Sequence, residues 1–259
     1  MQLIDMFNSA IADAEHLRLL YSTLLTSNQR AIRPEWANRF FRARLNAWPQ
    51  QNGLWRSANA NVLIVGTNAA QITHRHFQHQ SLAVLLRASL VLYMSAVDKI
   101  LHEAISKHFA KLAKDESLDD LVDISLSKAY SIAQHARLRT GKGGKKKKRP
   151  GHALKAEMLE DIYKDSYLKT SNLEKICAVC GRRQIFQAFA QTQPNLSANA
   201  ARDRWSRLYQ HRNRIAHECD IVRMAKPQKV KFHPVSAPAI MSDMDFVRDL
   251  GRYLANQLG

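Results

Sequence analysis

Hydrophobic positions recur along most of the chain at intervals of three and four residues, which is the period of an α-helix. In residues 3–25 this period places one apolar stripe on a predicted amphipathic helix, formed by Leu3, Phe7, Ala10, Ala14, Leu17, Tyr21 and Leu24. The pattern is longest and most apolar over residues 82–109, which we predict to be the central helix of a bundle. Further helices are predicted for residues 34–48, the second part of 115–139, 153–164, 173–190, a segment capped by Ser197 or Asn199, and a last segment that starts at Ser242.

Residues 50–72 do not follow the helical period. Their apolar run at 61–67 lies between Asn-rich flanks and is compatible with a lone strand, a buried loop or a helix turn. The run is too isolated to predict a sheet. Gly66 is not followed by the Gly-Lys-Ser/Thr of a phosphate-binding loop, so this segment carries no nucleotide-binding motif.

Composition agrees with an all-α fold. Hydrophobic residues make up 46% of the chain, whereas there are only 9 Gly and 7 Pro. We predict a helical N-terminal extension at residues 1–79 and a helical bundle at residues 80–259. A glycine-rich basic segment at residues 141–151 interrupts the bundle and is predicted to be a flexible surface loop.

The charge balance points to a polyanionic partner. Lys and Arg number 39 against 22 Asp and Glu, giving a formal net charge of +17, and such an excess favours nucleic acid first and an acidic protein second. Within the basic loop, we predict that the cationic run contacts phosphates without reading bases; this run consists of Lys145, Lys146, Lys147, Lys148 and Arg149. A nuclear-targeting segment or a tolerated loop insertion would have the same composition.

The sequence predicts a cytoplasmic protein that does not enter the membrane. Its first residues lack the basic start and apolar core of a signal peptide. The longest apolar stretch, at residues 82–97, is interrupted by Arg87 and two serines and is expected to be too short and too polar to span a bilayer. Three cysteines, an odd number, favour a reduced compartment.

Two clusters resemble metal sites, but neither has a favourable pattern. His74, His76 and His79 do not share one helical face, and we interpret them as a solvated, basic helix entry. Cys177 and Cys180 form a CxxC pair that Cys219 and a histidine, either His217 or His211, would complete as a zinc site. The pair is embedded among apolar residues of a helical pattern, so buried free cysteine is the preferred interpretation and no cofactor is predicted.

The candidate chemistry lies in residues 209–218, at the end of a helical pattern. Arg212 falls on or beside the apolar stripe of this helix, which comprises Ala201, Trp205, Leu208, Arg212 and Ile215. His217 follows five positions later, a rotation of about 140° and a rise of about 7.5 Å on a straight helix. The two side chains meet only if the helix frays, if Arg212 reaches along the axis, or if a second copy supplies one of them. Alternatively, both simply cap and solvate the helix end.

An arginine and an imidazole together suffice to cleave RNA without a metal. The imidazole accepts the proton of the 2′-hydroxyl or protonates the leaving 5′-oxygen. The guanidinium binds the phosphate and stabilises the charge that develops on it. This pair therefore makes Arg212 and His217 candidate catalytic residues.

The sequence Arg212-Asn213-x-x-x-His217 resembles the Arg-x(4–6)-His motif of the HEPN superfamily, in which a polar residue follows the arginine. The resemblance covers residues 80 to 258. It implies a helical bundle, metal-independent RNase activity, a homodimer that brings two Arg/His pairs together, and a role as a toxin or phage-defence effector held inactive by an antitoxin or other inhibitory partner. One departure is Cys219, because many toxins of the superfamily carry a tyrosine there that a partner can modify.

The resemblance also assigns Asp98. The segment Tyr93–Leu101 is similar to the first HEPN helix, in which an acidic residue follows a pair of small residues, and Asp98 would orient Arg212 or His217. A surface ion pair between Asp98 and His102 is an equally good interpretation.

We therefore predict an endoribonuclease with Arg212, His217, Asn213 and Asp98 at its catalytic site, and with Arg214 among the residues that contact RNA. The alternative is a non-catalytic basic module that binds RNA or a partner within a defence complex.

Overall fold

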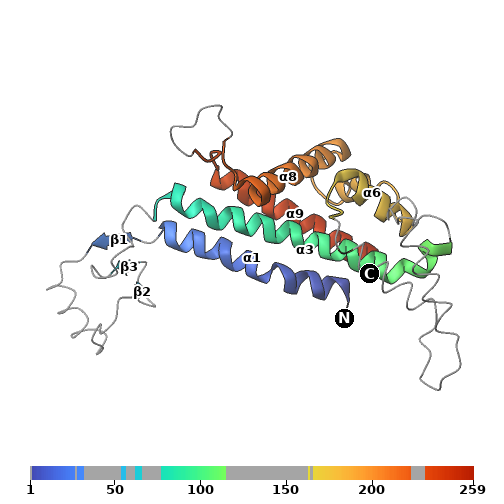
Figure 1. Cartoon of the computed structure of the whole chain (residues 1–259), viewed down its shortest axis with the longest axis horizontal. Coiled ribbons are helices and arrows are strands. Elements are labelled where there is room, and N and C mark those ends of the chain that lie inside the picture. The colour runs from blue at the N-terminus through green and yellow to red at the C-terminus, as the bar shows by residue number, and fades with distance from the viewer. Residues whose placement is uncertain are drawn as a thin grey trace, which may run out of the picture. The chain divides into compact units, whose positions relative to one another are not determined.

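A computed structural model of the chain describes residues 2–26, 28–31, 54–56, 62–65, 77–114, 163, 166–222 and 231–259. The described residues are predominantly helical, which confirms the all-α class (Figure 1). The helices are α1 (Leu3–Thr26), α3 (His79–Lys114), α6 (Thr170–Val179), α7 (Ile185–Ala190), α8 (Ala198–Glu218) and α9 (Ala237–Leu258). Several predictions lie outside the described residues: the helices within 34–48, 115–139 and 153–164, and the loop 141–151 with its cationic run.

The chain divides into two compact units. The first consists of Met1–Ile11, Val91–Phe232 and Asp243–Gly259, and the second of Ala12–Leu90 and His233–Ser242. The helices α1, α3 and α9 each contribute residues to both units. The division into a helical extension at residues 1–79 and a helical bundle at residues 80–259 stays a prediction.

In the first unit, the core is formed around the second half of α3. Its fully buried positions keep the helical period predicted for the central helix and include Tyr93, Met94, Val97, Ile100, Leu101, Ala104 and Ile105. The start of α1 approaches α9 closely, because a Cβ atom at Gly251 would lie 2.2 Å from the ring of Phe7. Glycine at this position thus allows the two helices to pack with a buried phenyl ring between them.

The length and hydropathy of α3 correct one sequence prediction. The sequence predicts that the apolar stretch at residues 82–97 is too short and too polar to span a bilayer, whereas the helical residues His79–His108 are long and apolar enough by these two criteria. The helix is continuous through Arg87 and the serines, and Ser89 is buried with its hydroxyl bonded to the backbone oxygen of Ala14 at 2.8 Å. Half of the most apolar window is buried inside the protein, and the core helix of a bundle meets the same two criteria as a membrane span.

Within the second unit, side chains form hydrogen bonds with groups that are distant in the sequence. His79 uses both ring nitrogens: Nδ1 lies 2.7 Å from the hydroxyl of Tyr21 and Nε2 lies 2.6 Å from the carbonyl oxygen of Val235. Because a carbonyl only accepts, Nε2 carries the proton and Nδ1 accepts from Tyr21 when the ring is neutral. His79 therefore ties α1 to the segment before α9. His74 and His76 lie outside the described residues.

The N-terminal part also contains a small sheet that the sequence did not predict. Strand β3 (Val62–Val65) lies between β1 (Asn28–Ala31), to which it is parallel, and β2 (Leu54–Arg56), to which it is antiparallel. The apolar run at 61–67 thus provides the central strand. Its partners are short and not apolar throughout, so neither carries a strand pattern that would have revealed the pairing.

Two helix boundaries differ from the prediction. The segment 173–190 forms two helices, α6 and α7, because Gly181 and Gln184 adopt left-handed backbone angles with φ of 82° and 54°. The last helix begins at Ala237, before the predicted Ser242. Pro238 lies in its first turn, where a helix requires no N–H donor, and so it does not prevent this earlier start.

Candidate functional site

The candidate site is built on α8, whose start and buried face are well defined. The hydroxyl of Ser197 accepts a hydrogen bond from the backbone N–H of Ala200 at 3.1 Å, so Ser197 is the N-cap. Ala201, Trp205 and Leu208 are buried, as their stripe predicted, and the indole N–H of Trp205 donates to the carbonyl oxygen of Leu168 at 2.8 Å. These contacts fix the rotation of the helix and thereby decide where its polar residues lie.

Arg212 continues this inward stripe and is half-buried. Its Nη1 donates to Oδ1 of Asn213 at 3.1 Å, whereas its Nε is buried and has no hydrogen-bond partner within the described part of the chain. A buried donor without an acceptor is destabilising by roughly 1–3 kcal/mol, and more when it carries charge. The guanidinium is therefore held by Asn213 and still has capacity for an anionic acceptor.

His217 lies in the last turn of α8 and is exposed. The helix remains regular to Glu218, so fraying does not bring His217 toward Arg212. Over the residues that the structure describes, these two side chains form no hydrogen bond with each other. They project from the helix about 140° apart, as the five-residue spacing requires.

Asp98 has a different environment from the one predicted. Its carboxylate oxygen Oδ1 accepts the backbone N–H of Tyr167 at 2.9 Å, and its backbone oxygen lies 2.8 Å from Nδ1 of His102. In the described portion of the chain, it forms no hydrogen bond or ion pair with Arg212 or His217. The hydrogen bond between Asp98 and His102 thus involves the backbone oxygen of Asp98.

Asp220, which no sequence pattern marks as a site residue, is fully buried beside the end of α8. Its Oδ1 lies 3.5 Å from Nε of Arg214 and its Oδ2 lies 3.7 Å from Nε2 of His211. An aspartate just beyond a helix usually indicates a solvated turn, so its position carried no signal of burial. The periodic spacing of His211 and Arg214, one turn apart, would only have shown that both share a side of the helix.

The predicted RNA-contacting residues are only partly described. The side chain of Arg214 is 43% exposed, so it faces both Asp220 and solvent. Lys145, Lys146, Lys147, Lys148 and Arg149 lie outside the described residues.

The three cysteines are free thiols in different surroundings. Cys177 is buried in α6, and burial raises the pKa of its thiol well above the ordinary range. Cys219 is exposed with a left-handed φ of 51°. Within the described ranges, no group of three or more His, Cys, Asp or Glu residues is placed to hold a metal ion.

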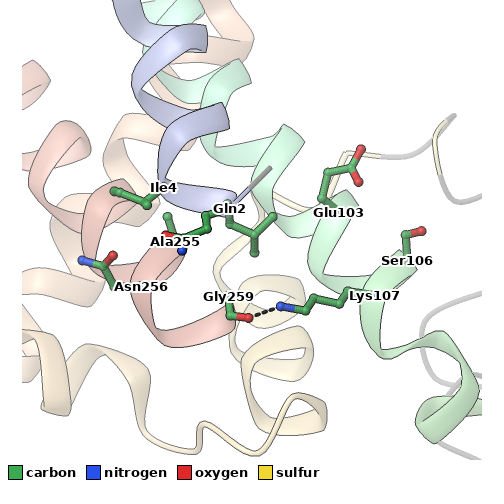
Figure 2. A pocket seen from close by; sticks show the side chains of 9 residues that line it. Gln2, Ile4, Glu103, Ser106, Lys107, Ala255, Asn256 and Gly259 are labelled. Atoms are coloured by element: carbon green, nitrogen blue, oxygen red, sulfur yellow. Dashed lines mark hydrogen bonds between the residues drawn. The ribbon is translucent and has the colours of Figure 1, made fainter.

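A pocket of about 670 Å³ lies away from these residues, between the start of α1, the C-terminal half of α3 and the end of α9. Figure 2 shows Glu103, Ser106 and Lys107 on one side of it, with Lys107 bonded to the backbone oxygen of Gly259. None of the predicted catalytic residues lines this pocket.

Beside this pocket, Glu103 belongs to a small cluster of charged and aromatic groups on α3. Its Oε1 accepts from Lys99 at 2.8 Å and from the hydroxyl of Tyr163 at 3.1 Å. The hydrogen bond from Lys99 lowers the pKa of Glu103, and the same bond raises the pKa of Lys99. Burial, followed by the charge of Glu103, raises the pKa of Tyr163.

Comparisons of the chain with family models, curated proteins and solved structures found no match. The resemblance to the HEPN superfamily therefore depends on the motif in α8 and on the helical fold around it.

Proposed function

We propose that this protein is a metal-independent endoribonuclease. In this proposal, His217 transfers the protons at the 2′-hydroxyl or the leaving 5′-oxygen, and Arg212 binds the scissile phosphate. Asn213 holds the guanidinium in place. Attack of the 2′-hydroxyl on phosphorus releases the 5′-oxygen, leaving a 2′,3′-cyclic phosphate and a 5′-hydroxyl end. DNA lacks the attacking group and is not cleaved.

The observation that carries the proposal is the environment of Arg212. Its Nη1 is fixed by Asn213 at 3.1 Å, while its buried Nε has no acceptor among the described residues. A phosphate oxygen would satisfy that donor, and a guanidinium already removed from water binds an anion more strongly than a solvated one. A solvated helix cap, the simplest alternative, would have left the donor exposed to water.

A second copy of the chain would complete the site. Because α8 is helical to Glu218, Arg212 and His217 project about 140° apart. We therefore propose a homodimer in which the two copies of α8 bring an arginine and a histidine to the same phosphate. This arrangement also follows from the HEPN resemblance.

The biological setting is proposed on charge and resemblance. A net charge of +17 suits RNA and also an acidic inhibitory protein. We propose a cytoplasmic toxin or phage-defence effector that such an antitoxin or other partner holds inactive, without a membrane-bound step.

The test uses purified protein with total RNA, in the presence and absence of a metal chelator. Cleavage should resist the chelator, yield 2′,3′-cyclic phosphate ends and fall about 10²- to 10⁴-fold in His217→Ala. His16→Ala is the matched control, because His16 is also an exposed helical histidine and lies on α1. Equal loss of activity in both variants, or cleavage that requires a divalent ion, would refute the proposed mechanism.

A second candidate is the non-catalytic basic module. It is favoured by one observation: the guanidinium of Arg212 is bonded to Asn213, and among the described residues no hydrogen bond joins Arg212 to His217. This alternative predicts RNA binding without cleavage in both the wild-type protein and His217→Ala.

A further inference from the structure

Arg214 and Asp220, at the two ends of a seven-residue segment, contact each other through both their backbones and their side chains. The carbonyl oxygen of Arg214 accepts the backbone N–H of Cys219 and, at 3.1 Å, that of Asp220. The guanidinium Nε of Arg214 lies 3.5 Å from Oδ1 of Asp220. A backbone hydrogen bond and an ion pair thus both hold the end of α8. His217 lies midway in sequence between Arg214 and Asp220.

This closure has an energetic cost that an ordinary helix end does not have. Cys219 and Asp220 both adopt positive φ, 51° and 55°, a conformation that non-glycine residues rarely occupy. Asp220 is also fully buried, and a buried carboxylate is destabilising unless cationic or hydrogen-bonding groups compensate it. A glycine followed by a solvated polar residue would end the helix without either cost.

Two side chains from the preceding two turns of α8, His211 and Arg214, lie beside the carboxylate of Asp220. Oδ2 of Asp220 lies 3.7 Å from Nε2 of His211, so a protonated His211 and Arg214 place positive charge on both sides of the carboxylate. Because the strained turn brings the carboxylate back to the helix that precedes it, the contact fixes the direction of the last turn.

We propose that Asp220 is a positioning residue for the candidate nuclease site, acting through Arg214 and His211 to fix the turn that carries His217. The inference rests on the proposed function. His217 is exposed, and no hydrogen bond from another described residue holds its imidazole, so the backbone of the last turn sets the region that the ring can reach. A displacement of about 1 Å in a catalytic group lowers the rate by roughly 10²-fold, so a fixed backbone is needed for proton transfer.

The first experiment measures amide hydrogen exchange over residues 215–220 in Asp220→Asn, which keeps the shape of the side chain and removes its charge. Exchange in this segment should become about 10-fold faster, since weakened local structure opens more often. The matched control is Arg202→Gln. Arg202 also lies on α8, but far from His217 in sequence, and its replacement removes a 2.9 Å ion pair with Glu174 of α6. Unchanged exchange in Asp220→Asn would overturn the proposal.

Arg214→Gln and Arg214→Lys provide a second route if Asp220→Asn does not fold. Arg214 is 43% exposed, so its replacement leaves the core intact. Exchange over residues 215–220 should rise in the glutamine variant and return to within about threefold of wild type in the lysine variant, which keeps a charge opposite Asp220. Equal exchange in these two variants would contradict the role of the ion pair.

The second experiment separates positioning from RNA binding. In Asp220→Asn, kcat should fall about 10- to 100-fold while KM for RNA stays within about threefold, because no cation that faces RNA is removed. A raised KM with unchanged kcat would overturn the positioning role. If the wild-type protein cleaves no RNA, the proposed nuclease fails, whereas hydrogen exchange still decides whether Asp220 fixes the turn at His217.

Discussion

Arg212 and Arg214 are separated by one residue on α8 but have opposite environments. Arg212 lies on the inward stripe with a buried Nε, and its guanidinium is bonded to Asn213. Arg214 is 43% exposed and faces the buried carboxylate of Asp220. A guanidinium paired with a carboxylate is neutralised, whereas one bonded to an amide keeps its charge for a ligand. This difference makes Arg212 the better candidate for binding the scissile phosphate.

At this scale, the sequence predicted the inward position of Arg212 but not the roles of the acidic residues. The helical stripe that contains Trp205 is local information, and it placed Arg212 correctly. The bond from Tyr167 to Asp98 and the burial of Asp220 depend on contacts that no periodic pattern encodes. Burial of a lone aspartate is also rare enough that composition argues against it.

The Glu103 cluster gives a prediction about pH. The pKa of Glu103 is lowered, so its ionised form stabilises the fold above the unfolded pKa of about 4.3, and this contribution is lost as pH falls through the folded value. Glu103→Gln should therefore be less stable than wild type at pH 7, by under about 1 kcal/mol because solvent screens the pair. In thermal unfolding, the difference should shrink as the pH falls below the unfolded pKa of Glu103, because its carboxyl then becomes protonated.

Added salt is the control for this prediction. At pH 7, the stability difference between wild type and Glu103→Gln should shrink at about 1 M salt, because salt screens exposed ion pairs. A stability difference that stays constant between pH 7 and pH 3 would show that the substitution acts through packing and not through the charge of Glu103.

Among the elements, the break between α6 and α7 shows what a periodic pattern misses. The apolar positions of residues 173–190 are compatible with one helix, and Leu173, Ile176, Ile185 and Phe186 are buried. Left-handed angles at Gly181 and Gln184 separate the two helices. Glycine alone is a weak signal inside a helical pattern, and a glutamine with positive φ gives no sequence signal at all.

Substitutions at these two positions should change stability in different directions. At Gly181, where φ is 82° and an added Cβ would contact nothing within 4 Å, replacement by alanine is expected to cost about 1 kcal/mol from the backbone alone. At Gln184, replacement by glycine relieves a positive φ but gives the unfolded chain more freedom. The free energy of unfolding of Gln184→Gly should therefore be equal to that of the wild-type protein or slightly higher.

Urea denaturation of both variants measures these changes as shifts in midpoint with an unchanged slope. If Gly181→Ala were neutral, or if Gln184→Gly were the more destabilising of the two, the backbone angles would not be the reason that α6 ends where it does.

For the whole molecule, the proposed nuclease requires that Arg212 and His217 reach the same phosphate. The all-α class could be predicted from periodicity and composition, because a long apolar helical pattern and few glycines favour helices over other fold classes. The arrangement of the candidate site could not be predicted in this way, since no local sequence pattern specifies which groups lie opposite α8. The motif predicts a pair of groups, whereas a single regular helix separates them by about 140°.

Mixing two inactive variants tests whether two copies share the site. Arg212→Ala lacks the phosphate-binding group and His217→Ala lacks the proton-transfer group, so each should be inactive alone. If subunits exchange, about half of the dimers in an equal mixture are mixed, and each mixed dimer has one arginine and one histidine on opposite copies. Measurable RNA cleavage should therefore return in the mixture. If the mixture stays inactive although both variants are dimeric and exchange subunits, Arg212 and His217 do not meet across a dimer, and the reaction would have to be performed within one copy of the chain.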